Sequence, residues 1–498
     1  MIYIDLKEIE INNFNTLKKR RKEMKKVLST VAALGLVAGM SASASALEWT
    51  ISGDYVVQGV NLNHASATEG VGFAGPRAGN FNNGTLNING PDDEQNSDAY
   101  YWHQFRTDVT MKVNDNIKVV SEIYMIDAYT VWEDTTGCAT ENGNYVNVFK
   151  LWMQYTTPFG LFEIGRMPNG QVLNAFTNTD LQGDGIKFSP TLPEPFVLSL
   201  TTQKVDEDDS LPSNLNYGDD QTDGDYDYYH VQAGYHTEKI VMDTALRYWD
   251  DARSKDPAAD EFNREYWTWW LAGDLNIGNF YAKGELSYTF GDWQAWEDDD
   301  SADDVDIDAW ALMLDAGVKF GDLDVGLMYF FLEGQDDDDD EMTAYMVQSE
   351  GAGGAFTPYY ILTGPQTAML NQDILGGDTI DPEMREAGAH CLGVHADFQV
   401  TPKLSVHGAL AYAWADETEF LGDIIDEDGS ADERDDSYGW EVDLGVAYKL
   451  LDNLTYSLNI GYLDTGDFFQ VAYDDGNTYE TDDTNDIVLV TNTLTMEF

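Results

Sequence analysis

The chain lacks features that many protein classes require. After residue 46 no segment approaches the roughly 18 consecutive apolar residues of a membrane-spanning helix. Two cysteines among 498 residues are too few for a disulfide scaffold, and no Cys-x-x-Cys-His motif is present to attach a c-type haem. These absences exclude a helical membrane protein, a disulfide-stapled domain and a c-type cytochrome.

Basic residues are also scarce. Residues 1–46 hold 8 of the 27 Lys and Arg and 4 of the 90 Asp and Glu, so the rest of the chain carries 19 bases, 86 acids and a formal charge of −67. Such a charge repels nucleic acid and other polyanions. The chain is nevertheless 43% hydrophobic and 13% aromatic, which is too apolar for a disordered protein. We therefore expect an ordered protein with no nucleic-acid partner.

The N-terminal region has the pattern of an export signal. Two lysines after Met24 precede a short, weakly apolar core, and an Ala-x-Ala cleavage site ends at Ala46. We assign residues 24–46 to a signal peptide and residues 1–23 to a translated upstream extension. Residues 47–498 then form one exported domain.

Hydrophobicity in this domain alternates with period two. In "NFYAKGELSYTF" (279–290) and "GWEVDLGVAYKL" (439–450) apolar and polar or small residues alternate over about ten positions, the length of a tilted strand that crosses a bilayer. Very short connections such as "NDN" (114–116) and "LDN" (451–453) alternate with long segments rich in Asp, Asn and Gly. This pattern predicts an all-β, transmembrane antiparallel barrel with short periplasmic turns and long acidic extracellular loops.

We predict about 18 strands, with 16 as the alternative if the weak pair around 183–204 is misread. The predicted strands centre on 47–60, 100–113, 117–130, 145–157, 160–167, 183–190, 195–204, 226–237, 240–250, 264–276, 279–290, 305–320, 322–333, 389–400, 403–415, 437–450, 454–464 and 486–498. Aromatic residues crowd the apolar faces near the long loops, as in an interfacial girdle. They are Trp267, Trp269, Tyr288, Phe290, Tyr329, Phe331, Trp414, Trp440 and Tyr462.

The chain ends on an alternating strand whose apolar face is Leu494, Met496 and Phe498. Together with the signal peptide and the alternating strands, this ending resembles Gram-negative outer-membrane porins. The resemblance implies that these three residues form a signal read by the barrel-assembly machinery. "PFGLFEIGR" (158–166) is similar to the porin turn and strand that lead into an inward-folded third loop.

That resemblance implies a water-filled channel for passive diffusion of small hydrophilic solutes. Homotrimers are usual in the family resembled, and the sequence leaves monomer and homotrimer both open. The alternatives are a structural, adhesive or plugged outer-membrane barrel and, less favoured, an outer-membrane enzyme. Expected partners are membrane lipid, lipopolysaccharide, the assembly machinery, small solutes or cations, and further copies of the chain. No cofactor is expected, and no confident metal site.

The polar alternates should line the lumen, with acids and bases nearly balanced. The acids are Asp54, Asp108, Glu163, Asp243, Asp274, Glu285, Asp315, Asp324, Asp397, Glu441 and Asp443, and the bases are Arg106, Lys112, Lys150, Lys187, Arg247, Lys283, Lys319 and Lys449. As candidates for the constriction we select Arg106, Lys150, Glu163, Arg166, Asp180, Asp184, Asp243, Arg247, Lys283 and Glu285.

Most of the acidity must then lie in the loops, which predicts a vestibule that attracts cations. "DEDGSAD" (426–432) faintly resembles a calcium loop, so loosely held Ca²⁺ is the one metal considered. The third loop (168–182) and the seventh (334–388) are more apolar than free loops and are the candidates for narrowing the pore. Cys138 and Cys391 face an oxidising space and either pair or remain two thiols.

The Ala-x-Ala site predicts that export removes everything before Leu47. Mass spectrometry of the N-terminal peptide of the membrane-extracted protein should find Leu47 as the first residue. A mature protein that retains Val31–Ala46 would contradict both the cleavage and the export route.

Overall fold

The computed structural model describes residues 47–63, 65–67, 86–88, 97–131, 146–169, 171–174, 176–178, 181–206, 225–252, 262–296, 304–336, 341–345, 356–364, 387–418, 424–425, 431–432, 435–469, 471–474, 479–482 and 485–498. No helix in these ranges is long and apolar enough to cross a membrane.

Eighteen antiparallel strands form one closed barrel, which confirms the predicted class and excludes the 16-strand alternative. The weak pair around 183–204 is real and forms β8 and β9. The barrel strands are β1 (Glu48–Asn63), β4 (Ser97–Lys112), β5 (Ile117–Val131), β6 (Asn147–Thr157), β7 (Gly160–Asn169), β8 (Leu181–Pro190), β9 (Phe196–Asp206), β10 (Tyr226–His236), β11 (Ile240–Asp251), β12 (Phe262–Ile277), β13 (Phe280–Trp296), β14 (Val305–Phe320), β15 (Leu323–Leu332), β17 (Ala389–Thr401), β18 (Leu404–Trp414), β21 (Ser437–Leu451), β22 (Leu454–Thr465) and β25 (Ile487–Glu497).

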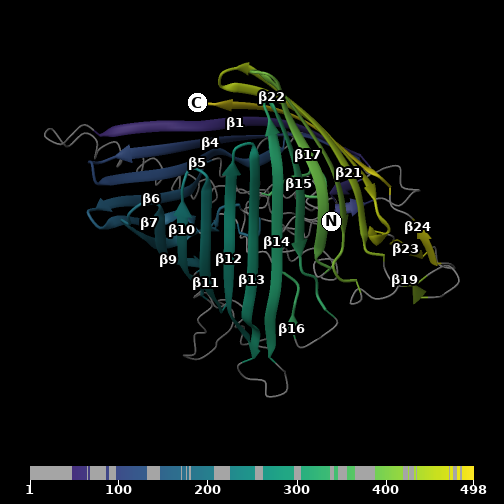
Figure 1. The fold of residues 1–498 in the computed structure, drawn as a ribbon, viewed down its shortest axis with the longest axis horizontal. Coiled ribbons are helices and arrows are strands. Elements are labelled where there is room, and N and C mark those ends of the chain that lie inside the picture. Colours follow the sequence, from purple (N-terminus) through teal and green to yellow (C-terminus); the bar gives the residue numbers. More distant parts are fainter. Residues whose placement is uncertain are drawn as a thin grey trace, which may run out of the picture.

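Several short strands and one 3₁₀ turn lie beside or outside the barrel wall. β16 (Glu341–Met342) adds a parallel pairing to β14, and a 3₁₀ turn covers Asp467–Phe469. Hairpins outside the barrel join β2 (Ala65–Ala67) to β3 (Leu86–Ile88), β19 (Ile424–Ile425) to β20 (Ala431–Asp432), and β23 (Val471–Asp474) to β24 (Tyr479–Asp482). In Figure 1 the barrel strands follow one another around one curved wall, and the C-terminal strand lies beside β1.

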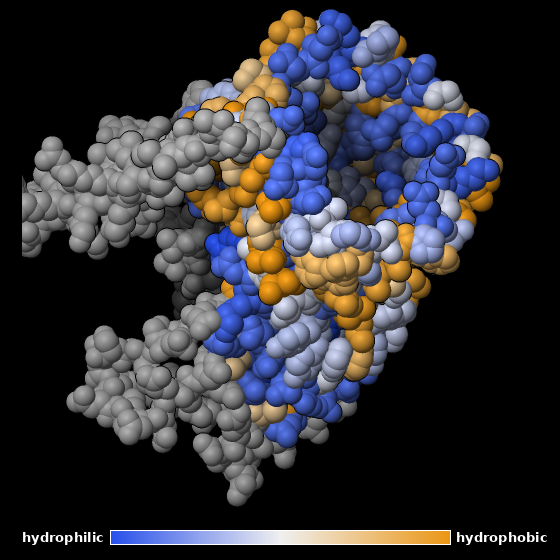
Figure 2. Space-filling view, turned by 90° about the vertical axis from the view of Figure 1, so that its left-hand side faces the viewer, coloured by the Kyte–Doolittle hydropathy of each residue, from blue (hydrophilic) through white to orange (hydrophobic). Residues whose placement is uncertain are grey.

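The alternation in the sequence separates an outer apolar face from a polar interior. On β21, Trp440, Val442 and Leu444 are each about half exposed on the outside, whereas Glu441 and Asp443 between them are buried inside. Figure 2 shows the hollow of the barrel with mostly hydrophilic residues around it and hydrophobic residues on the outer side. The outer face is therefore the surface that lipid covers.

Aromatic side chains form a stacked band on this outer face near the long loops. His390 stacks between Phe331 and Trp414, with ring centroids 4.8 and 4.9 Å apart, and Tyr412 lies 4.7 Å from Trp440. Amphipathic rings are favoured at the membrane–water interface. The band thus marks the extracellular edge of the apolar belt.

The last strand closes the barrel on the first. β25 pairs with β1 so that Met496 lies opposite Tyr55, and the backbones of Gly53 and Phe498 exchange two hydrogen bonds of 3.0 Å. The Phe498 ring lies 5.8 Å from Phe105. A Cβ atom on Gly53 would come within 2.9 Å of that ring and 2.2 Å of a backbone oxygen, so the seam requires glycine there.

We expect Phe498→Ser to weaken the seam, because it removes an aromatic contact worth about 0.5–1.5 kcal/mol. Denaturant unfolding in detergent micelles, followed by tryptophan fluorescence, should show a lower midpoint and slower refolding. Phe320→Ser is the matched control. Phe320 is an exposed aromatic residue at the C-terminal end of its strand, β14, as Phe498 is at the end of the last strand, but it lies away from the seam between β1 and β25. Equal losses in the two variants would contradict a special role for Phe498.

Candidate channel and its inward-folded loops

Along the six barrel strands from β1 to β8, acids and bases of the inner wall pair with each other. Arg106 pairs with Asp54 at 2.6 Å, Lys150 with Glu122 at 3.3 Å, and the ammonium of Lys187 lies 3.9 Å from Glu163. Each pair joins neighbouring strands between β1 and β8. This part of the wall therefore offers little net charge to a passing ion.

The third loop, between β7 and β8, folds into the barrel. Its side chains Val172, Phe176, Thr177 and Asn178 are completely or almost completely buried. Leu173 adopts a φ of +35°, a rare conformation for a non-glycine residue. The loop therefore holds a fixed shape against the wall.

A wall carboxylate holds this loop in place. Glu285 of β13 accepts hydrogen bonds from Thr177 N (2.9 Å), Thr177 Oγ1 (2.6 Å) and Phe176 N (3.2 Å). The indole N–H of Trp270 donates to Thr177 Oγ1 at 3.1 Å, and the Asn174 amide donates to the carbonyl of Gly284 at 2.9 Å. Glu285 therefore acts as an anchor for the third loop.

The seventh loop, between β15 and β17, is anchored in the same way by β21, five strands further along the wall. Glu441 of β21 accepts Ile361 N at 2.6 Å and Leu362 N at 2.7 Å. Asp443 accepts Tyr360 N at 3.0 Å. Ile361 and Leu362 are fully buried.

Glycines on the wall make room for the seventh loop. A Cβ atom on Gly393 would lie 2.1 Å from the Tyr359 hydroxyl, and one on Gly445 would lie 2.3 Å from the Tyr360 hydroxyl. Larger residues at these positions would push the loop away from β17 and β21.

Both ends of the seventh loop are also fixed at the rim. Gly334 N donates to Asp416 at 2.9 Å, and the carbonyl of Ala387 accepts the N–H groups of Asp416 (2.8 Å) and Glu417 (3.0 Å). Glu333 accepts Trp310 N at 2.6 Å, and burial raises the pKa of Glu333 to about 7.

The two loops meet inside the barrel. Phe176 of the third loop and Phe356 of the seventh lie 4.8 Å apart, and both contact Phe330 of β15. Beside this contact is a pocket of about 280 Å³. Its lining comprises Asn174, Lys283, Met313, Asp315, Met328, Phe356, Thr357 and Pro358. We call this space the eyelet pocket.

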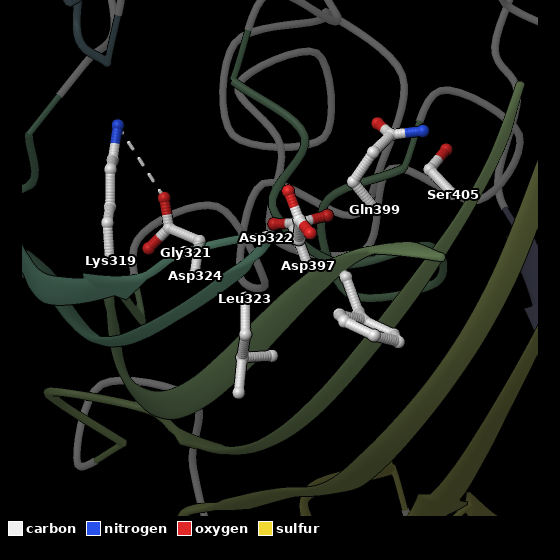
Figure 3. Close-up of a pocket in the computed structure, with 9 residues that line it drawn as sticks. Lys319, Gly321, Asp322, Leu323, Asp324, Asp397, Gln399 and Ser405 are labelled. Carbon is white, nitrogen blue, oxygen red and sulfur yellow. Dashed lines mark ion pairs between the residues drawn. The ribbon is translucent and has the colours of Figure 1, made fainter. Parts of the chain in front are cut away.

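Acidic side chains continue from the eyelet pocket toward the short turns. Asp315 bonds His395 at 3.0 Å, and a second pocket, of about 370 Å³, contains Asp322, Asp324 and Asp397. In Figure 3 Lys319 pairs with Asp324, at 3.7 Å, and Asp397 lies across the same space. We call Asp315, Asp324 and Asp397 the acidic track.

The predicted constriction residues lie in several different environments in the structure. Lys150, Asp243, Arg247 and Glu285 are on the inner wall but almost completely buried. Arg247 lies 4.6–4.9 Å from the rings of Tyr228, Trp249 and Trp270 and cannot face open water. Arg106 and Glu163 belong to the charge-paired part of the wall between β1 and β8. Of the ten candidates only Lys283 lines the eyelet pocket, and Asp180 lies outside the described residues.

Two of the candidates were wrong, because they lie on the outer face. Arg166 of β7 lies opposite Leu151 of β6 and Asp184 of β8. Arg166 and Asp184 are each two residues along their strands from Ile164 and Ile186, whose side chains face outward. Strand parity therefore places both charges outside the barrel.

Of the two cysteines that could pair, Cys391 is a free, buried cysteine on the inner wall, covered by the seventh loop. Cys138 lies outside the described residues, so the pairing stays a prediction. Among the described residues no group of three or more His, Cys, Asp or Glu side chains could hold a metal ion. Most of "DEDGSAD" lies outside the described residues.

Sequence reasoning missed the anchoring role of Glu285 and Glu441, although it placed both on the inner wall. It also did not identify His395 and Asn174, because neither residue belongs to a recognisable sequence motif. The apolar character of both loops was the one signal: it marked them as candidates for narrowing the pore, and the described residues of both loops fold inward.

Together, the closed barrel, the outer apolar belt and the loops folded into a polar interior define a Gram-negative outer-membrane channel. The chain belongs to the Gram-negative porin family, whose pattern matches residues 30–350. No curated protein sequence matches the chain.

Solved outer-membrane proteins are similar to the chain over most of its length. OpdQ of Pseudomonas aeruginosa is 12% identical with a TM-score of 0.45, covering 90% of this chain and 97% of its own. OmpT of Vibrio cholerae, in its trimer form, is 10% identical with a TM-score of 0.38, covering 91% and 100%. An anion-selective porin from Comamonas acidovorans is 11% identical with a TM-score of 0.38, also covering 91% and 100%.

We expect Glu441→Gln to loosen the seventh loop, because the amide keeps one acceptor oxygen and replaces the other by a donor that faces a backbone N–H. A buried donor left without an acceptor costs about 1–3 kcal/mol. Single-channel recordings in 1 M KCl, where wall charges are largely screened, should show a larger and noisier conductance. Glu163→Gln is the matched control: Glu163 bonds Trp152 and Gln154 on the wall and holds no described loop residue. Identical traces for Glu441→Gln and the unmodified protein would contradict the anchor.

Proposed function

We propose that the protein is a porin that lets small hydrophilic solutes diffuse passively, with a preference for cations. The path runs past the junction of the third and seventh loops and along the acidic track. The observation that carries the proposal is the placement of Asp315, Asp324 and Asp397 along two pockets inside the barrel, with Lys283 and Lys319 as the lysines that line them. Fixed carboxylates beside a water path raise the local cation concentration.

Two sources of negative charge support the cation preference. The long loops hold acidic runs such as "QDDDDDE" (335–341), and the track lies deeper, between β14 and β17. Charges at an open mouth are screened by salt, whereas charges in a narrow passage are screened less. The two contributions can therefore be separated by ionic strength.

The proposal includes the route and partners of the chain. A cleaved signal peptide would deliver residues 47–498 to the periplasm, and the assembly machinery would read the strand ending in Phe498. Lipid and lipopolysaccharide would cover the outer face, and copies of the chain would associate as a homotrimer. No cofactor takes part.

Reversal potentials across KCl gradients, at mean concentrations from about 0.01 to 1 M, test the selectivity. The Debye length falls from about 30 Å to about 3 Å over this range, so cation preference should be strong in dilute salt and much weaker at 1 M. The preference left at 1 M should fall further in Asp315→Asn/Asp397→Asn. Anion selectivity would contradict the proposal.

The same recordings separate the alternatives. A plugged or structural barrel would insert without conductance steps, whereas a homotrimer would add three conducting units in one insertion. Single-unit insertions would contradict the homotrimer.

A further inference from the structure

The eyelet pocket joins opposite charges with an apolar wall. Lys283 and Asp315 are directly opposite each other on β13 and β14, and directly opposite residues have Cβ atoms about 4.5–5.5 Å apart. The pocket is also lined by Met313 of β14, by Met328, which is directly opposite Asp315 on β15, and by Phe356 of the seventh loop. The pocket can therefore contact both charged groups and a hydrocarbon.

The Lys283 ammonium is exposed, and it forms no hydrogen bond or ion pair within 4 Å with any residue that the structure describes, although Asp274 of β12 lies directly opposite it on the other side from Asp315. Asp315 binds His395, at 3.0 Å. Lys283 thus differs from Arg106 and Lys150, which pair directly with carboxylates.

We infer that the eyelet pocket is a binding site for a small zwitterion with an apolar side chain, that is, an apolar α-amino acid. Its carboxylate would contact Lys283, its ammonium Asp315, and its side chain Met313, Met328 and Phe356. The inference rests on the proposed channel function and names one class of solute for it.

The size of the pocket agrees with this class. Sites for drug-sized ligands occupy about 300–1,000 Å³. A pocket of about 280 Å³ thus fits a metabolite smaller than these. The open setting also suits a channel, in which a solute must bind weakly enough to leave.

Solute block of the single-channel current tests the inference with three probes of similar shape. L-leucine carries both charges, 4-methylpentanoate lacks the ammonium and isopentylamine lacks the carboxylate. We expect leucine to block at a concentration about tenfold lower than either analogue, a factor that corresponds to about 1.4 kcal/mol. Glycine, which lacks the apolar side chain, should block more weakly than leucine.

Two variants assign the contacts. Lys283→Met should abolish the preference for leucine over isopentylamine, and Asp315→Asn the preference for leucine over 4-methylpentanoate. Lys449→Met and Asp108→Asn are the matched controls, because both residues are wall positions outside the eyelet pocket, and they should leave both preferences unchanged. An unmodified channel that blocks equally with all probes would overturn the inference.

The experiments distinguish an incorrect amino-acid site from an incorrect channel function. If the protein conducts with cation preference but leucine has no advantage, the inference alone falls. If it does not conduct, the proposed function falls, and equilibrium binding of radiolabelled leucine to the detergent-solubilised barrel still tests the pocket. Saturable binding that Lys283→Met removes would support the site, and absence of saturable binding would overturn it.

Discussion

Pairing of the backbone in lipid is the constraint on which the rest of this structure depends. An unpaired N–H or C=O group in hydrocarbon costs several kcal/mol, so a wall of strands must close on itself. Here β25 closes on β1, with Phe498 and Gly53 sharing two backbone hydrogen bonds at the seam. Closure fixes an outer face for lipid and an inner face for water, and every other feature is built on that division.

A second constraint is that long loops must be held inside a wide barrel. A loop that folds inward brings backbone N–H groups that need acceptors. Glu285 and Glu441 supply these acceptors from the wall, two backbone N–H groups each. Carboxylates on the inner face therefore divide between anchoring loops, pairing with bases and lining the water path, and position on the wall decides which task each performs.

The sequence predicted the wall well because the relevant physics is local. Alternating apolar and polar residues, short turns and the terminal strand all depend on neighbours in the chain, so strand positions agree closely with those of the structure. Arg166 and Asp184 were wrong constriction candidates because their selection departed from this logic: parity counted from the inward-facing Glu163 and Lys187 puts both on the outer face. Parity also did not show that Arg247, which is on the inner wall, is enclosed by the rings of Tyr228, Trp249 and Trp270.

By itself, the sequence determined the class of protein and indicated about 18 strands, because period and composition encode which side chains lipid and water accept. It also indicated that the third and seventh loops could narrow the pore, and the tertiary structure excluded the 16-strand alternative. The tertiary structure alone decided which wall carboxylates hold the loops and which face the water. Glu285 meets Thr177 across 108 positions, and Glu441 meets Ile361 across 80. Such contacts depend on where distant segments pass inside the closed barrel, which no local pattern records.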